Sequence, residues 1–251
     1  MPLEALVFDI DGTLADTEEG HRCAFNLAFE HFGLGWHWER GEYVGLLRIT
    51  GGKERMAYHV ATLTLSAAEK RRIAAHIPEI HAKKNRIYAS MAADGFLLRP
   101  GVARLIGEAR AAGVRLAIAS TTTRDNIDAL LRATLGEGSV AWFDVIACGD
   151  DVPRKKPAPD IYQLALRRLE RDGSTCVAFE DSVNGLRSAV AAGLPTVVTP
   201  TAWTQGSDFV SAGLVLPHLG DPDAPLPDEP GRNLRHAAWL TLGELQERLA
   251  A

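Results

Sequence analysis

The sequence has few cysteines, no long apolar run and no excess of basic residues. Its three cysteines, Cys23, Cys148 and Cys176, are widely spaced and form no CxxC pair, so we expect reduced thiols and neither a disulfide framework nor a zinc site. No apolar stretch approaches the roughly 20 residues that span a bilayer. The first apolar run lacks a basic leader and a small-residue cleavage site, which disfavours a signal peptide. We therefore expect a cytoplasmic protein that does not associate with membranes.

The charge balance is mildly acidic. The chain carries 27 Lys and Arg against 32 Asp and Glu, a net charge of −5. Proteins that bind nucleic acids usually have basic surfaces, so this balance argues weakly against nucleic acid as a partner. With 251 residues, of which 46% are hydrophobic, the chain is long enough for one large α/β domain or for a core domain with a smaller insertion.

Short apolar runs alternate with amphipathic segments along most of the chain. The runs are typical of buried parallel strands and lie at Ala5–Phe8, Val114–Ala119, Val145–Ala147, Val177–Phe179 and Thr196–Val198. Segments with helical periodicity lie at Ala103–Ala111, Ile127–Ala133, Ile161–Leu169 and Leu186–Ala192. This alternation predicts an α/β fold with a parallel sheet covered on both faces. Ligands of such sheets bind beyond the carboxyl ends of the strands.

The segment from about residue 16 to about residue 94 has no convincing strand run. Three helical stretches fill it, at Ala24–Phe32, Lys53–Leu63 and Ala67–Ala89, with glycines between them. We therefore predict a helical domain at residues 16–94, inserted into a core domain made of residues 1–15 and 95–251.

Asp9 and Asp11 follow the first strand run and are separated by one residue. In an extended chain, residues two apart point to the same side, so the two carboxylates can converge at the sheet edge. Two carboxylates this close are tolerated when a cation or a proton separates them. Mg²⁺ takes oxygen ligands and typically uses one or two carboxylates together with a substrate phosphate. An acidic turn that caps a strand is the alternative interpretation.

The other predicted strands also end in polar residues. Hydroxyl residues begin at Ser120 after the second run, and Glu180 and Asp181 follow the run at Val177–Phe179. Lys156 lies just before a predicted helix. Taken singly, each group fits a helix cap or a solvated turn. Together they place acids, a hydroxyl and a lysine at one sheet edge, and this set suits a metal, a phosphate and a nucleophilic aspartate.

Four segments carry a family resemblance. FDIDGTLADTE, AIASTTT, KKPAPDIY and FEDSVNGLRSAVAAG resemble, in order and spacing, the four signature motifs of the haloacid dehalogenase superfamily. The resemblance implies a Rossmann-like core with a helical cap domain inserted after the first motif. It implies Asp9 as nucleophile, Asp11 as general acid and base, and Ser120 and Lys156 as phosphate-binding residues. It also implies Mg²⁺ held by Asp9, the backbone carbonyl of Asp11 and Asp181, with Glu180 close by.

Three segments of the insertion, TEEGHRCAFN, GLLRITGGKERMAYHV and EIHAKKN, resemble the CbbY group of this superfamily. Its members are sugar phosphatases that remove one phosphate from xylulose-1,5-bisphosphate, an inhibitory side product of Rubisco. The resemblance implies a sugar bisphosphate as partner and a metabolic link to Rubisco without direct binding. Carried over by motif, the substrate-binding residues are Glu18, Gly51, Gly52, Lys53, Glu54, Arg55, His81, Lys84, Thr121, Thr122, Thr123, Arg124, Asp125 and Asn126, and Tyr43 can line the cleft.

The cations of this set suggest a second phosphate site. A monophosphate would leave several of them facing a cleft without an anion, whereas a bisphosphate would use them; they are Lys53, Arg55, Lys84 and Arg124, with His81 as a further candidate. Glu18 and Glu54 would accept hydrogen bonds from sugar hydroxyls. The alternative is that these lysines and arginines form a solvated helix face.

Other functions stay open at this point. A phosphoglucomutase-like transferase and a phosphoglycolate-type phosphatase would share the core motifs. A phospho-accepting receiver or a catalytically silent phosphosugar-binding protein belongs to a different class, although a receiver lacks a large cap and a silent relative would have lost Asp9 or Asp11. GGKER is no P-loop, because Glu54 follows the lysine where Ser or Thr is required.

Two further expectations concern histidines and the C-terminal region. We assign His21, His31, His37 and His59 to packing or to the surface rather than to ligand binding. The acidic, proline-rich stretch at residues 221–232 is longer than the family pattern leads us to expect and predicts an irregular surface segment. TLGEL after it predicts a capping box, with Thr241 as the N-cap of a short last helix.

Overall fold

The computed structural model describes residues 2–93, 95–228, 234 and 238–250. Its centre is a parallel sheet in the order β3-β2-β1-β4-β5-β6. The strands are β1 (Ala5–Phe8), β2 (Arg115–Ala119), β3 (Val145–Ala147), β4 (Cys176–Glu180), β5 (Thr196–Val198) and β6 (Leu214–Val215). The predicted α/β fold with a parallel sheet is confirmed. The short strand β6 was not predicted, because two residues carry no periodicity.

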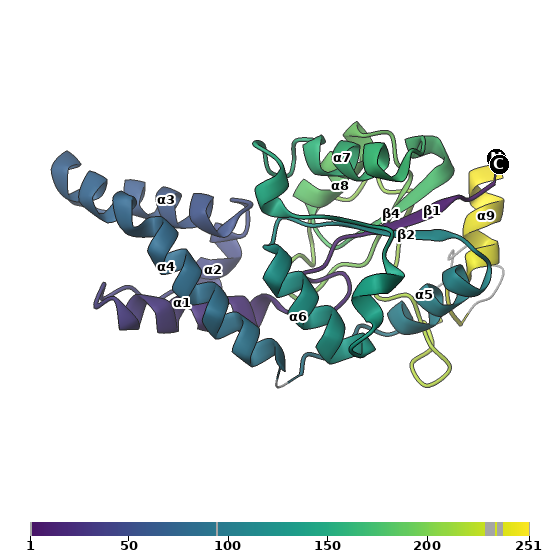
Figure 1. Ribbon diagram of the computed structural model, residues 1–251, viewed down its shortest axis with the longest axis horizontal. Helices are drawn as coiled ribbons and strands as arrows, with labels where there is room; N and C mark the ends of the chain where they lie inside the picture. Colours follow the sequence, from purple (N-terminus) through teal and green to yellow (C-terminus); the bar gives the residue numbers. More distant parts are fainter. Residues whose placement is uncertain (1, 94, 229–233, 235–237, 251) are drawn as a thin grey trace.

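Helices cover both faces of the sheet (Figure 1). The elements are α5 (Val102–Ala111), α6 (Arg124–Leu135), α7 (Asp160–Leu169), α8 (Val183–Ala191) and α9 (Leu242–Ala250), with short 3₁₀ turns η1 (Ser139–Trp142), η2 (Gly149–Asp151) and η3 (Gly173–Thr175). Alternate residues of β1 point to opposite faces. Leu6 and Phe8 pack with α5, α6 and α9, and Ala5 and Val7 pack with α7 and α8.

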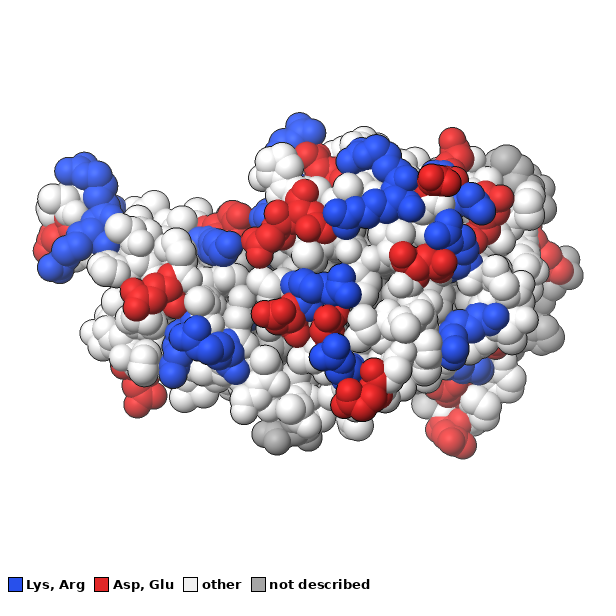
Figure 2. All heavy atoms as spheres, viewed as in Figure 1, with Lys and Arg blue, Asp and Glu red and all other residues white. Residues whose placement is uncertain are grey.

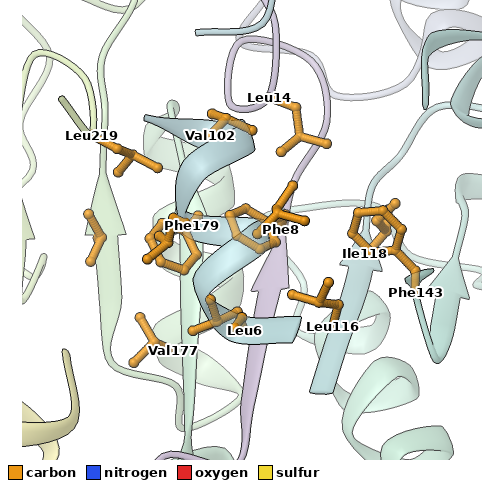
Figure 3. Close-up of a cluster of buried hydrophobic side chains, with 14 of the residues drawn as sticks. Leu6, Phe8, Leu14, Val102, Leu116, Ile118, Phe143, Val177, Phe179 and Leu219 are labelled. Atoms are coloured by element: carbon orange, nitrogen blue, oxygen red, sulfur yellow. The ribbon is translucent and has the colours of Figure 1, made fainter. Parts of the chain in front are cut away.

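The larger of the two apolar clusters lies on the sheet face that α5, α6 and α9 cover, and it contains a pair of stacked aromatic rings. Figure 3 shows Phe8 and Phe179 side by side between Leu6, Val102 and Ile118. The two ring centroids lie 4.5 Å apart with their planes 13° from parallel. Phe8 directly precedes Asp9, and Phe179 directly precedes Glu180. Because the two rings stack in register, the two acids lie side by side at the carboxyl ends of β1 and β4.

Four helices lie apart from the sheet, at the left of Figure 1. They are α1 (Glu18–His31), α2 (Arg40–Leu46), α3 (Gly52–Thr62) and α4 (Ala67–Ala93). Their own apolar cluster contains Phe25, Phe29, Trp38 and Met56, all at most 1% exposed. The aromatic residues of this cluster therefore pack between the helices of the segment. Helix α2 was missed, because Gly41 and Gly45 interrupt its pattern.

The surface and the C-terminal segment add three observations. On the face shown in Figure 2, acidic and basic side chains are interspersed. Of the described helices, none combines the length and apolarity that a membrane crossing requires. The last helix begins as predicted, with the amide of Glu244 donating to the Thr241 hydroxyl at 3.2 Å. Residues 229–233 of the proline-rich stretch lie outside the described part of the chain.

Arg99 joins the segments that surround the first motif. The two chain crossings between the helical layer and the sheet lie side by side, since Ala15 and Leu98 form a β-bridge. Arg99 follows Leu98 and is 8% exposed. Its guanidinium donates to the carbonyl oxygens of Gly12, Thr199, Pro200 and Pro217, at 2.5, 2.5, 2.9 and 2.8 Å. One side chain thus satisfies carbonyl groups from three separate loops.

Replacing Arg99 with alanine should destabilise the protein strongly. The change leaves buried carbonyl groups without a donor, and each unsatisfied group costs about 1 to 3 kcal/mol, so we expect a loss of about 3 kcal/mol or more. Urea unfolding followed by circular dichroism measures it. Arg132→Ala is the control. Among the described residues, the side chain of Arg132 makes only an exposed ion pair, at 4.0 Å, so its loss should change stability by less than about 0.5 kcal/mol. Equal stability of the two variants would contradict this role of Arg99.

Candidate active site

The carboxyl ends of β1, β2 and β4 form the floor of a pocket of about 700 Å³. The helical layer forms its opposite wall. Most of the predicted site residues line it: Asp9, Asp11, Glu18, Gly51, Gly52, Arg55, His81, Lys84, Ser120, Thr121, Thr122, Thr123, Lys156, Glu180 and Asp181. Residues that are far apart in the sequence therefore meet at the edge where the strand order predicts a ligand site.

Lys156 links the two acidic strand ends. Its ammonium lies 2.7 Å from the Asp9 carboxylate and 2.5 Å from that of Glu180. Tyr162, on α7, donates its hydroxyl to the same Glu180 oxygen at 2.6 Å. Burial disfavours the charged lysine, but Asp9 and Glu180 outweigh this cost and raise the pKa of Lys156 above its ordinary value. Lys156 is thus a permanently charged group that holds both carboxylates in place.

One lysine does not balance the negative charge of the floor. Oxygen atoms of Asp9, Glu180 and Asp181 all lie within 4.8 Å of one another, and the three residues are buried. Burial raises the pKa of Asp9 to about 7, opposed by Lys156. Burial, with the charges of Asp9 and Glu180, also raises the pKa of Asp181 well above its ordinary value. No described residue donates a hydrogen bond to the Asp181 carboxylate. An unpartnered buried carboxylate beside a second one suits a hard cation.

Two glycines let the backbone approach these acids closely. A Cβ on Gly12, whose φ is +81°, would lie 2.4 Å from an Asp181 oxygen. A Cβ on Gly185, in the first turn of α8, would lie 1.7 Å from a Glu180 oxygen. Glu180 is bonded to both Lys156 and Tyr162, whereas Asp9 is bonded to Lys156 and Asp181 accepts from no described residue. Asp9 and Asp181 are therefore the carboxylates more available to a metal ion.

Asp11 is held by residues of the helical layer. Its carboxylate accepts the Thr17 hydroxyl at 2.6 Å and contacts the His21 ring at 2.8 Å. Burial alone would raise its pKa, but His21 and Thr17 outweigh burial and lower the pKa of Asp11 to about 2. The other nitrogen of His21 lies 2.6 Å from the ammonium of Lys84. The assignment of His21 to packing alone is therefore incomplete: the ring stacks on Tyr88 but also contacts Asp11.

Arg55 is a buried cation that faces the pocket. It is 8% exposed and lies within 4.0 Å of no described carboxylate. Its guanidinium donates to the Tyr43 hydroxyl at 2.7 Å, and Tyr43 donates to Glu18 at 3.1 Å. Tyr43 is fully buried behind Arg55 rather than in the pocket wall. The predicted residues Glu18, Tyr43 and Arg55 thus form one hydrogen-bonded row.

The structure sorts the predicted cations into two groups. Arg55 and Lys84 are buried in the pocket wall. Lys53 and Arg124 instead make exposed ion pairs with Asp150 at 3.1 Å and Asp128 at 2.8 Å, outside that wall. His81 lines the pocket, but burial, together with Lys84 and Lys53, lowers its pKa to about 3 and leaves it neutral.

Three further predicted residues lie outside the pocket wall. The Glu54 carboxylate lies over Gly51, where a Cβ would come within 2.1 Å of it. Asn126 is buried and donates to Thr122 at 3.2 Å and to Asn85 at 3.3 Å. Asp125 is exposed in the first turn of α6. A substrate contact for Glu54, Asp125 and Asn126 stays a prediction.

Sequence reasoning missed several residues of the pocket wall. They come from loops and helix starts whose neighbours are set only by the fold: His21, Arg48, Asn85, Asn184, Arg187 and residues 203–208. One signal was available for His21. It lies three residues after Glu18, so both share a helix face directed at the first motif.

Comparisons with known proteins agree with this geometry. The family model of the haloacid dehalogenase-like hydrolases matches residues 3–193. Protein CbbY, plasmid, of Cupriavidus necator is 48% identical over 246 residues, which cover 97% of this chain and 96% of the relative. Protein CbbY of Rhodobacter capsulatus is 50% identical over 220 residues, covering 87% of this chain and 95% of the relative.

Solved structures are similar as well. CbbY from Rhodobacter sphaeroides in complex with phosphate has a TM-score of 0.79 and 46% identity, covering 86% of this chain and 94% of that one. A mutant of the same protein in complex with xylulose-(1,5)bisphosphate has a TM-score of 0.79 and 45% identity with the same coverage.

Lys84 should titrate far below an ordinary lysine. Burial disfavours its charged form and lowers its pKa from 10.5 to about 7, although Asp11 and Glu18 oppose the shift. The ammonium is therefore present below about pH 7 and lost above it. NMR of protein labelled at the lysine side chains should show one resonance with a midpoint near pH 7 that is missing in Lys84→Met. Titration of all lysines near 10.5 would contradict the described surroundings of Lys84.

Proposed function

The chain belongs to the haloacid dehalogenase-like hydrolase family and is a phosphatase that acts on sugar phosphates, and we propose that its substrate is xylulose-1,5-bisphosphate and its cofactor Mg²⁺. The product is then xylulose-5-phosphate. We also propose that residues 16–94 act as a cap over a core of residues 1–15 and 95–251, and that the protein acts in the cytoplasm.

The observation that carries this proposal is that cationic side chains lie on two opposite sides of one pocket, the floor formed by the sheet edge and the wall formed by residues 16–94, called the cap wall below. On the floor, Lys156 and the Ser120 hydroxyl lie beside Asp9 and suit the phosphate that is transferred. On the cap wall, Arg55 and Lys84 are 8% and 4% exposed, and neither has a carboxylate partner among the described residues. A buried charge without a counter-ion is costly. A second phosphate of the substrate would supply that counter-ion.

The floor is suited to transfer through a covalent intermediate. We propose that Asp9 attacks phosphorus, so that the oxygen–phosphorus bond to the sugar breaks and an aspartyl-phosphate forms. Lys156 stays charged beside Asp9 and offsets the charge of the transferring phosphate. Water then attacks the aspartyl-phosphate, which releases inorganic phosphate and regenerates Asp9.

Asp11 is placed to move the protons of both steps. Its pKa of about 2 keeps the carboxylate ionised, which is the form that can accept a proton from the attacking water. The leaving sugar oxygen needs a proton in the first step, and we propose that Asp11 delivers it. His21, bonded to Asp11 at 2.8 Å and to Lys84 at 2.6 Å, can supply that proton to the carboxylate.

The residues present fit a Mg²⁺ ion. Asp9 and Asp181 would hold it together with the backbone carbonyl of Asp11, with Glu180 nearby but committed to Lys156. When bound, the ion neutralises the acidic floor and polarises the phosphate. Asp9 would contact the ion, whereas the side chain of Asp11 is directed to Thr17 and His21.

The alternative functions fit the pocket less well. Phosphoglycolate is a small monophosphate whose other anionic group is a carboxylate close to the phosphate, so it offers Arg55 and Lys84 no second phosphate. A silent binding protein would not need Asp9 and Asp11, and both line the pocket. A mutase-like transfer between sugar hydroxyls uses the same floor, and the products of the reaction with a bisphosphate distinguish it from hydrolysis.

The first test is the substrate preference and its dependence on Arg55. With Mg²⁺, phosphate release should be fastest from xylulose-1,5-bisphosphate within a panel of sugar mono- and bisphosphates and phosphoglycolate. Arg55→Ala should lower kcat/KM on the bisphosphate by about 100-fold, because losing a buried hydrogen-bonded charge costs roughly 3 kcal/mol. Turnover of p-nitrophenyl phosphate, which has no second anion, should change little.

Arg71→Ala is the matched control, since that arginine is an exposed residue of α4 outside the pocket wall. It should keep full activity on both esters. Equal losses on both esters in Arg55→Ala would contradict a second phosphate site. So would a wild-type protein that is faster on phosphoglycolate than on the bisphosphate.

The second test concerns the metal ion. Asp181→Ala should weaken Mg²⁺ binding by at least tenfold in calorimetry, because the ion loses a carboxylate ligand. Chelation with EDTA should abolish phosphate release, and added Mg²⁺ should restore it. Glu137→Gln, a change at a 92% exposed side chain, should bind Mg²⁺ normally. Full activity without metal would refute this part of the proposal.

A further inference from the structure

Residues 47–51 join α2 to α3 and form one edge of the pocket. From the cap side, Arg55 holds this loop. Its Nε donates to the carbonyl oxygens of Leu46 at 3.2 Å and Ile49 at 3.3 Å. The direction of the Arg55 guanidinium therefore depends on where the 47–51 loop lies.

The core holds the same loop through Asn184. Its side-chain amide donates to the backbone oxygen of Arg48 at 3.0 Å and to the Thr50 hydroxyl at 2.9 Å. These two bonds join residues that are more than 130 positions apart in the chain. Asn184 lies three residues after Asp181, at the start of α8, and also lines the pocket.

The start of α8 is itself rigidly placed against the acidic floor. The Ser182 hydroxyl caps the helix by accepting the Gly185 amide at 3.1 Å. The Glu180 carboxylate lies so close to Gly185 that no side chain fits there. A residue in this first turn therefore has a fixed position relative to Glu180 and Asp181.

We propose that Asn184 is a positioning residue for the second phosphate. Asn184 holds the 47–51 loop to the core, and the loop in turn orients Arg55. Asn184 therefore sets the distance between the Arg55 guanidinium and the pocket floor. The inference rests on the proposed use of Arg55 for a distal phosphate. Asn184 acts through the loop and through Arg55, while the transferring phosphate is bound by other residues.

A second contact across the same boundary supplies the control. Lys53 of α3 pairs with Asp150 at 3.1 Å, but both side chains are about half exposed, at 45% and 60%. Exposed ion pairs contribute little. Asp150→Asn therefore breaks a core–cap contact without touching the 47–51 loop.

The experiment compares Asn184→Ala, Thr50→Val, the double variant and Asp150→Asn with the wild type. Losing two hydrogen bonds should lower kcat/KM for xylulose-1,5-bisphosphate by about tenfold in Asn184→Ala, mainly through KM. The double variant should be no worse than Asn184→Ala, because Thr50 acts through the same bond. Turnover of p-nitrophenyl phosphate should change less than twofold, and Asp150→Asn should resemble the wild type on both esters.

Amide hydrogen exchange separates this inference from the choice of substrate. With Mg²⁺ and inorganic phosphate, the peptide covering residues 46–52 should exchange faster in Asn184→Ala than in the wild type and Asp150→Asn. Unchanged exchange would overturn the inference whatever the substrate is. Equal losses on both esters would overturn it as well, since they indicate a merely structural role. Faster exchange in a protein whose wild type does not hydrolyse the bisphosphate would instead refute the proposed substrate and support the hold on the loop.

Discussion

The contact of Lys156 with Asp9 and Glu180 is the interaction on which the site depends. Three carboxylates are buried at one sheet edge, and without a cation they would repel one another and take up protons. Lys156 lies 2.7 and 2.5 Å from two of them and keeps these acids available for chemistry. The stacked pair Phe8 and Phe179 holds those two acids side by side at the carboxyl ends of their strands.

The two sides of the pocket carry opposite charge. The floor has a surplus of carboxylates, which suits a metal ion and a phosphate bound through it. The opposite wall has the reverse property, because Arg55 and Lys84 are buried without acidic partners among the described residues. A substrate that carries a phosphate at each end matches this arrangement. The second phosphate would also raise the pKa of Lys84 and hold it in its charged form.

The fold and the floor could be predicted because they depend on local patterns. β1, β3 and β5 have the predicted bounds, and strand ends in a parallel sheet converge by topology, which brought Asp9, Ser120 and Glu180 together. The cap wall was less predictable. Lys53 and Arg55 are neighbours on one helix, yet one pairs with Asp150 at the surface and the other is buried at the pocket. His21 and Asn184 act on partners set only by how the helical layer sits on the core.

The central claim is that Asp9 takes the phosphate covalently, and rapid acid quench tests it most directly. Wild-type protein mixed with Mg²⁺ and radiolabelled bisphosphate should carry label within the first turnover, on the peptide that contains Asp9. Asp9→Asn should fold normally, carry no label and release no phosphate, because an amide oxygen is a poor nucleophile. Label on another residue, or normal phosphate release by Asp9→Asn, would contradict the account.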